Sequence, residues 1–187
     1  MTNCADWATR YQQPTADDID ALIDQYQVQG VVIQPHAELG ELTTATRVSI
    51  DHSLERGLSV DCYLPPNWTS LSLTRWVYIS NLIKRAYPDQ IYRWWTDIED
   101  DMIDEPGLLT PTEIIDAALR LLPENTGIYY AVGTVNQYLP NWLWPTTVPR
   151  WVARWGTEPT LRPGEAMVQY AAGVVITDNF TVDLDVY

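Results

Sequence analysis

Short apolar runs and longer amphipathic stretches alternate along the chain. A short apolar run bounded by turn residues predicts a buried strand, and apolar residues spaced three or four apart predict a helix that covers it. Eight runs predict strands, at residues 4–8, 30–35, 58–64, 90–99, 127–132, 150–155, 166–171 and 180–186. Helix-like stretches lie at residues 19–26, 43–56, 71–86 and 110–122, and the last three strands follow with no room for full helices between them.

The alternation of strands and helices favours a parallel sheet in an α/β fold. Eight strands indicate closure into a TIM-like barrel, with five helical crossovers and three helix-poor strands at its end. The pattern also allows an open, doubly wound sheet. Because the sequence contains no internal repeat, low-complexity tract or linker, we expect a single domain over residues 1–187.

The charge of the chain argues against one class of partner. The formal net charge is −14 and Lys84 is the only lysine, which argues against nucleic acid because phosphate contacts need Lys and Arg. No apolar run reaches the length that spans a bilayer, so we expect no membrane partner. The N-terminus lacks a basic stretch followed by an apolar one, which predicts a soluble protein made in the cytoplasm without a Sec signal.

Cysteine and histidine are scarce. Cys4 and Cys62 are too few for a disulfide scaffold or a thiolate metal site, and each falls in a predicted buried strand. His36 and His52 add no ligands at the spacing that zinc requires. The sequence also lacks a nucleophile elbow, a Walker loop and a dinucleotide-binding glycine motif. We therefore expect neither a metal nor a cofactor.

The segment WWTDIEDDMIDE, residues 94–105, carries the strongest chemical signal. On a strand, alternate side chains share a face, so Trp95, Asp97 and Glu99 are predicted to point the same way. Two carboxylates whose Cα atoms lie about 6.6 Å apart repel each other, and the pKa of one of them rises. A glycosidase needs such a pair, one acid to protonate the leaving oxygen and one carboxylate to stabilise the cationic sugar. Taken alone, the motif fits a solvated strand end equally well.

Further acids occur in the first and last predicted strands. Asp6 lies among apolar and aromatic neighbours, and Asp183 and Asp185 share one face of the last strand. In a closed barrel the first and last strands are neighbours, so these acids are expected to converge with the pair on the fourth strand. An acid in an apolar strand is costly unless it is paired, which favours a function. For Asp185 we expect a structural or exposed role.

The aromatic residues are biased toward polar types, with nine Trp and eleven Tyr against one Phe. Trp and Tyr combine a flat face, on which sugar C–H groups stack, with a polar group. Six of them fall in or near strand ends: Tyr63, Trp95, Tyr129, Trp151, Trp155 and Tyr170. As a set they favour a carbohydrate ligand, although any single one is more often part of a barrel core.

Together these residues resemble the glycoside hydrolase family 25 lysozymes, the N-acetylmuramidases that include many phage endolysins. The family carries an Asp in the first strand, Asp-x-Glu at the end of the fourth and Val-Asp-Leu near the C-terminus, which are similar to Asp6, to Asp97 with Glu99, and to Asp183. Other similar stretches contain Tyr63, GIYY at 127–130, WVARW at 151–155, and Gln169 with Tyr170. The resemblance covers essentially the whole chain and implies a flattened (β/α)5β3 barrel.

By this resemblance the catalytic set is Glu99, Asp97, Asp6 and Asp183. Glu99 is the general acid, Asp97 supports it or acts at the anomeric carbon, and the other two orient groups or bind substrate. Substrate contacts are expected from Tyr63, Trp95, Tyr129, Trp151, Trp155, Gln169 and Tyr170.

The implied activity is cleavage of the β-1,4 bond between N-acetylmuramic acid and N-acetylglucosamine in peptidoglycan, by a phage lysin that acts at the cell wall. One alternative is a non-catalytic barrel that binds glycan or, with virion proteins as partners, supports a virion. Another is a glycosidase for a different polysaccharide.

Overall fold

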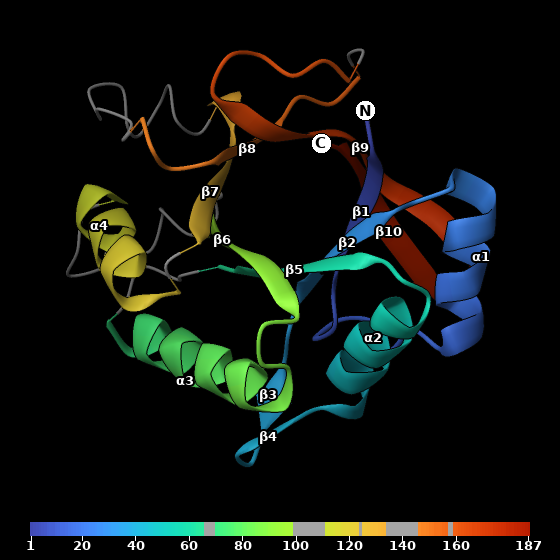
Figure 1. The fold of residues 1–187 in the computed structure, drawn as a ribbon, viewed down its shortest axis with the longest axis horizontal. Helices are drawn as coiled ribbons and strands as arrows, with labels where there is room; N and C mark the ends of the chain where they lie inside the picture. The colour runs from blue at the N-terminus through green and yellow to red at the C-terminus, as the bar shows by residue number, and fades with distance from the viewer. Residues whose placement is uncertain (66–69, 99–110, 124, 134–145, 157–158) are drawn as a thin grey trace.

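Eight strands close into a barrel in the computed structural model of the protein (Figure 1), which describes residues 1–187 except 66–69, 99–110, 124, 134–145 and 157–158. The barrel strands are β1 (Asn3–Ala8), β2 (Gly30–Gln34), β5 (Ser59–Leu64), β6 (Ile91–Ile98), β7 (Thr126–Ala131), β8 (Arg150–Ala153), β9 (Glu165–Thr177) and β10 (Phe180–Val186). Each pairs with its neighbours in chain order, and β1 pairs with both β2 and β10. The predicted barrel is confirmed, and the open, doubly wound alternative is wrong because β1 and β10 close the sheet.

Helices lie outside the barrel and connect successive strands (Figure 1). They are α1 (Ala16–Tyr26), α2 (Thr44–Glu55), α3 (Ser70–Ala86) and α4 (Pro111–Leu121). These four helices agree with the predicted stretches, while the fifth crossover, between β7 and β8, falls mostly on residues 134–145, outside the described part of the chain. Among the residues that the structure describes, no helix is both long enough and apolar enough to span a membrane.

The last strand runs against its neighbours. β10 is antiparallel to both β9 and β1, whereas the other barrel pairs are parallel. The reason is local: only residues 178–179 separate β9 from β10, and so short a connection can form a hairpin but not a crossover. As a result Asp6 on β1 lies directly opposite Asp183 on β10.

Strand β9 extends six residues beyond its predicted end at residue 171. In its second half, residues 172–177, Ile176 is buried while the other side chains are exposed or partly exposed, and this half pairs with β10 alone. It therefore lacks the continuous buried run by which the first half is detected. Gly173 interrupts the pairing with a φ of +67°, next to an irregularity in the register of Val182 and Leu184. Such a bulge redirects side chains on the strands that it joins.

The core has two layers, as expected of a barrel covered by helices. An outer cluster packs strand residues such as Trp94 and Cys62 against helix residues such as Ile50. An inner cluster fills the barrel with Cys4, Val32, Trp95, Tyr129, Trp151, Ala153 and Met167. Trp94 and Trp95 therefore face opposite sides, as the strand period predicts. Both cysteines are free and buried, which confirms their predicted role as small apolar side chains.

A short hairpin lies between β2 and α2 that the apolar pattern does not predict. It consists of β3 (Ala37–Glu38) and β4 (Glu41–Leu42). Leu39 and Gly40 form its turn, with φ values of +49° and +91°, the combination found in a type I′ turn. Strands of two residues are too short to show a periodicity of their own, so the sequence predicted no element between the strand at 30–35 and the helix at 43–56.

Candidate active site

Acidic side chains line the interior of the barrel toward the ends at which the parallel strands finish. Asp6 on β1 is 6% exposed and Asp97, at the end of β6, is 5% exposed. Asp97 lies opposite Tyr129 on β7, and Tyr129 lies opposite Trp151 on β8. In barrels with parallel strands, the carboxyl ends of the strands form the face on which active sites are built. Glu99 follows β6 in the sequence but lies outside the described residues, so the predicted pair of Asp97 and Glu99 stays a prediction.

One amide group joins several of the predicted site residues. The Gln169 side chain on β9 donates from Nε2 to Asp6 Oδ2 at 2.9 Å and to Asp183 Oδ2 at 3.3 Å. Its Oε1 accepts from the Tyr129 hydroxyl at 3.0 Å and from Trp155 Nε1 at 2.9 Å. We call these five residues, Asp6, Tyr129, Trp155, Gln169 and Asp183, the Gln169 network.

The chemistry of the partners fixes the orientation of this amide. An indole N–H can only donate, so it needs the amide oxygen, and an ionised carboxylate can only accept, so it needs the amide NH₂. The Gln169 network is therefore consistent in only one orientation, in which Asp6 and Asp183 are held side by side as acceptors. Two like charges this close repel each other, and the shared NH₂ group offsets part of that repulsion.

The bulge at Gly173 aims Asp183 into the network. The Gly173 N–H donates to Asp183 Oδ1 at 2.7 Å, while the other oxygen of the carboxyl faces Gln169. Burial raises the pKa of Asp183, although the hydrogen bond from Gly173 opposes the shift. The left-handed backbone at Gly173 is one that glycine adopts without strain, which gives this residue a role that the sequence alone did not indicate.

Asp185 lies deeper than the Gln169 network and is fully buried. Trp151 Nε1 donates to its Oδ1 at 2.8 Å. Burial, the negative charge of Asp6 and a hydrogen bond with the Asp6 carboxyl raise the pKa of Asp185 well above its usual value. Two carboxyl groups can hydrogen-bond only if one of them keeps its proton. The raised pKa of Asp185 favours its protonated form, which is the form that can donate to Asp6. Of the two expected roles of Asp185, structural or exposed, the exposed one is wrong because the side chain is fully buried.

The predicted aromatic residues divide into three groups. Trp95, Tyr129 and Trp151 are buried and pack together, with ring centroids 5.6 Å apart for Trp95 and Trp151 and 4.4 Å apart for Tyr129 and Trp151. Tyr63 is half-buried and contacts the edge of Trp151, and Trp155 is 56% exposed while bonded to Gln169. Tyr170 belongs to a different place, because its side chain packs against the outer cluster.

A separate acid closes the opposite end of the barrel. Asp61 on β5 is fully buried and accepts at Oδ2 from Trp95 Nε1 at 2.8 Å and from the Tyr187 hydroxyl at 3.1 Å. Burial raises its pKa to about 6, although the hydrogen bond from Trp95 and the charge of Arg93 act against the shift. Sequence reasoning did not single out Asp61, yet the signal was the same as for Asp6, an acid within an apolar strand.

No cluster of potential metal ligands occurs among the residues that the structure describes. The site offers buried carboxyl groups, two of which, those of Asp183 and Asp185, have raised pKa values, beside an exposed Trp. Such an arrangement suits proton transfer to a glycosidic oxygen and stabilisation of positive charge on a sugar ring.

Comparison with known proteins gives matches in structure only. No family model and no curated protein sequence matches the chain. A family 25 glycosyl hydrolase from Bacillus anthracis is similar to it with a TM-score of 0.68 and 13% identity, over 100% of this chain and 88% of the other. A muramidase from Acremonium alcalophilum gives a TM-score of 0.66 and 14% identity, over 100% and 93%. The catalytic domain of an endolysin from the Listeria monocytogenes bacteriophage P40 gives 0.66 and 16%, over 99% and 92%. The chain therefore has the fold of the family 25 lysozymes, as its sequence resemblance implied.

Proposed function

We propose that this protein is a glycoside hydrolase of the lysozyme type, which cleaves the β-1,4 bond between N-acetylmuramic acid and N-acetylglucosamine in peptidoglycan. The observation that carries the proposal is the Gln169 network, which gathers Asp6 and Asp183 at the carboxyl end of a barrel with the family 25 fold. Asp97, on the strand that precedes Glu99, is buried inside the same barrel. Acids desolvated by burial are frequent at catalytic sites, which supports the proposal.

In the proposed mechanism Glu99 protonates the glycosidic oxygen, and Asp97 stabilises the positive charge that develops at the anomeric carbon or attacks it. Asp6 and Asp183 bind or orient the sugar that is attacked. Gln169 holds these two carboxyl groups in place, and neutral Asp185 supports Asp6 from below. The role of Glu99 comes from its position in the Asp-x-Glu motif alone.

Substrate contacts are proposed for the aromatic residues that can reach a ligand. Trp155 has an exposed ring on which a sugar can stack, and Tyr63 is half-buried. Tyr129, Trp95 and Trp151 are buried, so we propose that they act by supporting the site: Tyr129 donates to Gln169, and Trp151 packs against Tyr63. The substrate contact predicted for Tyr170 stays a prediction, since its side chain packs in the outer cluster.

The biological setting is part of the proposal. We propose a phage lysin that acts on the cell wall, supported by the likeness to the catalytic domain of a phage endolysin. The alternative is a non-catalytic barrel that binds glycan or serves a virion, and the net charge of −14 favours it to the extent that an anionic wall repels the protein.

The test is the release of reducing ends from purified peptidoglycan, with the products sized by mass spectrometry. The wild-type protein is expected to generate new reducing N-acetylmuramic acid ends. No release from several types of wall by folded protein would favour the non-catalytic barrel, and new reducing ends on a different sugar would redirect the proposal to another glycosidase specificity.

A further inference from the structure

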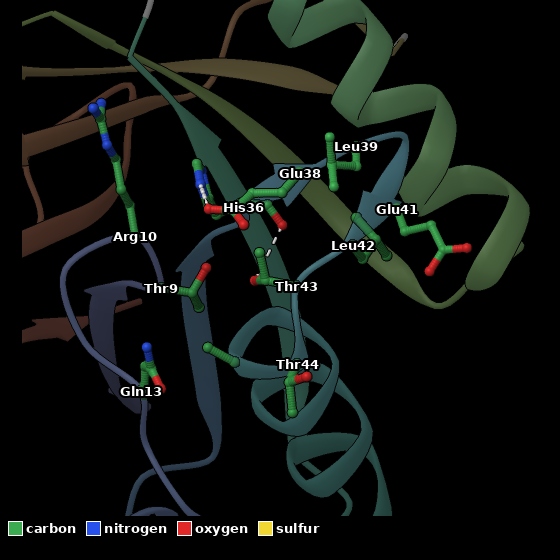
Figure 2. A pocket seen from close by; sticks show the side chains of 11 residues that line it. Thr9, Arg10, Gln13, His36, Glu38, Leu39, Glu41, Leu42, Thr43 and Thr44 are labelled. Atoms are coloured by element: carbon green, nitrogen blue, oxygen red, sulfur yellow. Dashed lines mark hydrogen bonds and ion pairs between the residues drawn. The ribbon is translucent and has the colours of Figure 1, made fainter.

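A concave site lies beside the mouth of the barrel, and its lining contains no residue of the Gln169 network. It is a pocket of about 920 Å³ between the segment that follows β1 and the β3–β4 hairpin. Figure 2 shows Thr9, Arg10 and Gln13 on one side of it and Glu38, Leu39, Glu41 and Leu42 on the other. Its volume is in the range of sites that bind small ligands.

The floor of the pocket is rigid and closely tied to the barrel. Thr9 donates from its backbone N–H and its hydroxyl to the Gln34 carbonyl at the end of β2. The Thr46 hydroxyl contacts the Thr9 hydroxyl at 2.8 Å and accepts from the His36 N–H at 2.8 Å. Thr9 follows Asp6 by three residues, which corresponds to about 10 Å along an extended chain. A group attached to a sugar at Asp6 can therefore reach this pocket.

Residues of opposite charge line the two sides of the pocket. On the β1 side, Arg10 is exposed, and it forms no ion pair with the residues that the structure describes. Its guanidinium lies 5.6 Å from the ring centroid of Tyr11. On the hairpin side, Glu41 is exposed and Glu38 is largely exposed, and His36 is a partner of Glu38 at 3.3 Å. A neutral sugar needs no such separation of charge, whereas a ligand with a carboxylate at one end and an ammonium group at the other matches it.

The rim also offers apolar contact. Leu39, at the tip of the hairpin, is fully exposed, and Tyr11, beside Arg10, is 76% exposed. Leu39 also has a left-handed backbone, which a leucine rarely adopts. Neither burial nor backbone preference accounts for a leucine at this position. Contact with a ligand that carries small apolar side chains, as a short peptide does, accounts for it.

We propose that this pocket binds the short zwitterionic peptide carried by the glycan strand, with peptide carboxylate on Arg10 and peptide ammonium on Glu38 and Glu41. The inference rests on the proposed function, because it makes the pocket a second recognition site for a peptidoglycan substrate. It adds a property that the barrel site does not require: preference for strands that carry peptides over the same strands without them.

The experiment compares two substrates that differ only in the peptide. Soluble glycan strands are used either intact or after an amidase has removed their peptides, and kcat/KM is measured from reducing ends. Reversal of one charge, Arg10→Glu, is expected to lower kcat/KM on intact strands about tenfold, since it replaces a charge-assisted hydrogen bond with repulsion. On stripped strands the variant is expected to match the wild type.

A matched control is Arg85→Glu. Arg85 is also exposed but lies in the last turn of α3, which leads from the end of β5 to the start of β6 and so ends at the opposite side of the barrel. This variant is expected to act like wild type on both substrates. Equal losses for Arg10→Glu on intact and stripped strands would show that the pocket binds the glycan itself. No loss on either substrate would show that nothing binds there during the reaction.

A binding experiment separates this inference from the proposed activity. A synthetic Ala-Glu-Lys-Ala tetrapeptide is titrated into the 15N-labelled protein, and shifts are expected at Arg10, His36 and Leu39 and not in the Gln169 network. If wild type cleaves no strand but these shifts occur, the proposed hydrolase fails and the peptide pocket stands. If strands are cleaved and the peptide shifts no pocket resonance, only the pocket inference is overturned.

Discussion

The two ends of the barrel bury acids in different ways. At the end near the chain termini, Asp61 accepts two hydrogen bonds, from Trp95 and Tyr187, and has no second carboxyl group among its described contacts. At the other end, Asp6 and Asp183 share the NH₂ group of Gln169, and burial and the charge of Asp6 raise the pKa of Asp185. At the first end two donors serve one carboxyl group, although both bond to Oδ2 and Oδ1 has no partner among the described residues. At the second end one NH₂ group serves two carboxyl groups.

In the proposed mechanism this difference separates a structural acid from the acids that take part in the reaction. Asp61 joins its strand to Trp95 and Tyr187 by its hydrogen bonds. Acids that compete for too few donors must divide protons unequally, which gives a neutral acid beside a carboxylate. A glycosidase uses that unequal division, and the comparison therefore predicts that substitutions at the two ends change different properties of the protein.

The largest effect is expected from Glu99→Gln, which removes the proton donor and keeps the shape of the side chain. Hydrolysis of peptidoglycan is expected to fall by about 10²–10⁴-fold, the range for loss of general acid catalysis, with the melting temperature nearly unchanged. Reducing-end release and calorimetry measure the two properties. A variant with the wild-type rate would remove Glu99 from the mechanism.

Asp97→Asn is expected to reduce turnover severely as well, and a rate within a few-fold of wild type would make Asp97 structural.

The next largest effect is expected from a substitution in the Gln169 network. Gln169→Leu leaves Asp6 and Asp183 without their shared donor, so we expect a loss of about 3 kcal/mol in the free energy of unfolding, typical of buried charged groups that lose a partner. Hydrolysis is expected to fall as well, because the two acids move apart. Urea unfolding and reducing-end release measure these changes, with the exposed Gln90→Leu as a control. If Gln169→Leu has the wild-type free energy of unfolding and the wild-type rate of hydrolysis, Gln169 does not position Asp6 and Asp183.

At the other end, Asp61→Asn tests the structural acid. The folded pKa of Asp61, about 6, lies above its ordinary 3.8, so the folded state binds the proton more tightly and the free energy of unfolding falls as pH rises through this range. The Asn variant lacks this fall. Its stability relative to wild type is expected to increase by about 3 kcal/mol between pH 4 and pH 8, with hydrolysis unchanged. Denaturant unfolding of both proteins across that pH range measures this change. If the difference in free energy of unfolding between them does not vary with pH, burial does not raise the pKa of Asp61.

The smallest effect is expected from Asp185→Asn. An amide can accept from Trp151 and donate to Asp6, as the neutral acid does, so hydrolysis near the optimum is expected to remain close to wild type. Because the pKa of Asp185 is raised, wild-type stability is lost as pH rises through it, and the variant is expected to lose less stability as the pH rises. Asp185→Leu, which cannot donate, is expected to shift the pH profile of kcat/KM. If Asn and Leu behave alike in that profile, Asp185 does not act through Asp6.

The sequence predicted the barrel because strand and helix periods are local properties. The adjacency of Asp6 and Asp183 also followed, since closure makes the first and last strands neighbours. The hydrogen bond from Gln169 to Asp6 joins residues 163 positions apart, and no local pattern contains such a contact, so Gln169 was found only through the family resemblance. The same limit applies to the β3–β4 hairpin, to the bulge at Gly173 and to the side of the barrel on which Tyr170 packs.

The closure of β1 on β10 also determines where the ends of the chain lie. The backbones of Thr2 and Tyr187 hydrogen-bond to each other, and Figure 1 shows both termini close together. They lie at the end of the barrel marked by Asp61, away from the acids at its mouth. A tether to a solid support at either terminus therefore leaves the mouth open to a polymeric substrate. A short linker could also join the two ends, which makes the barrel a candidate for circular permutation.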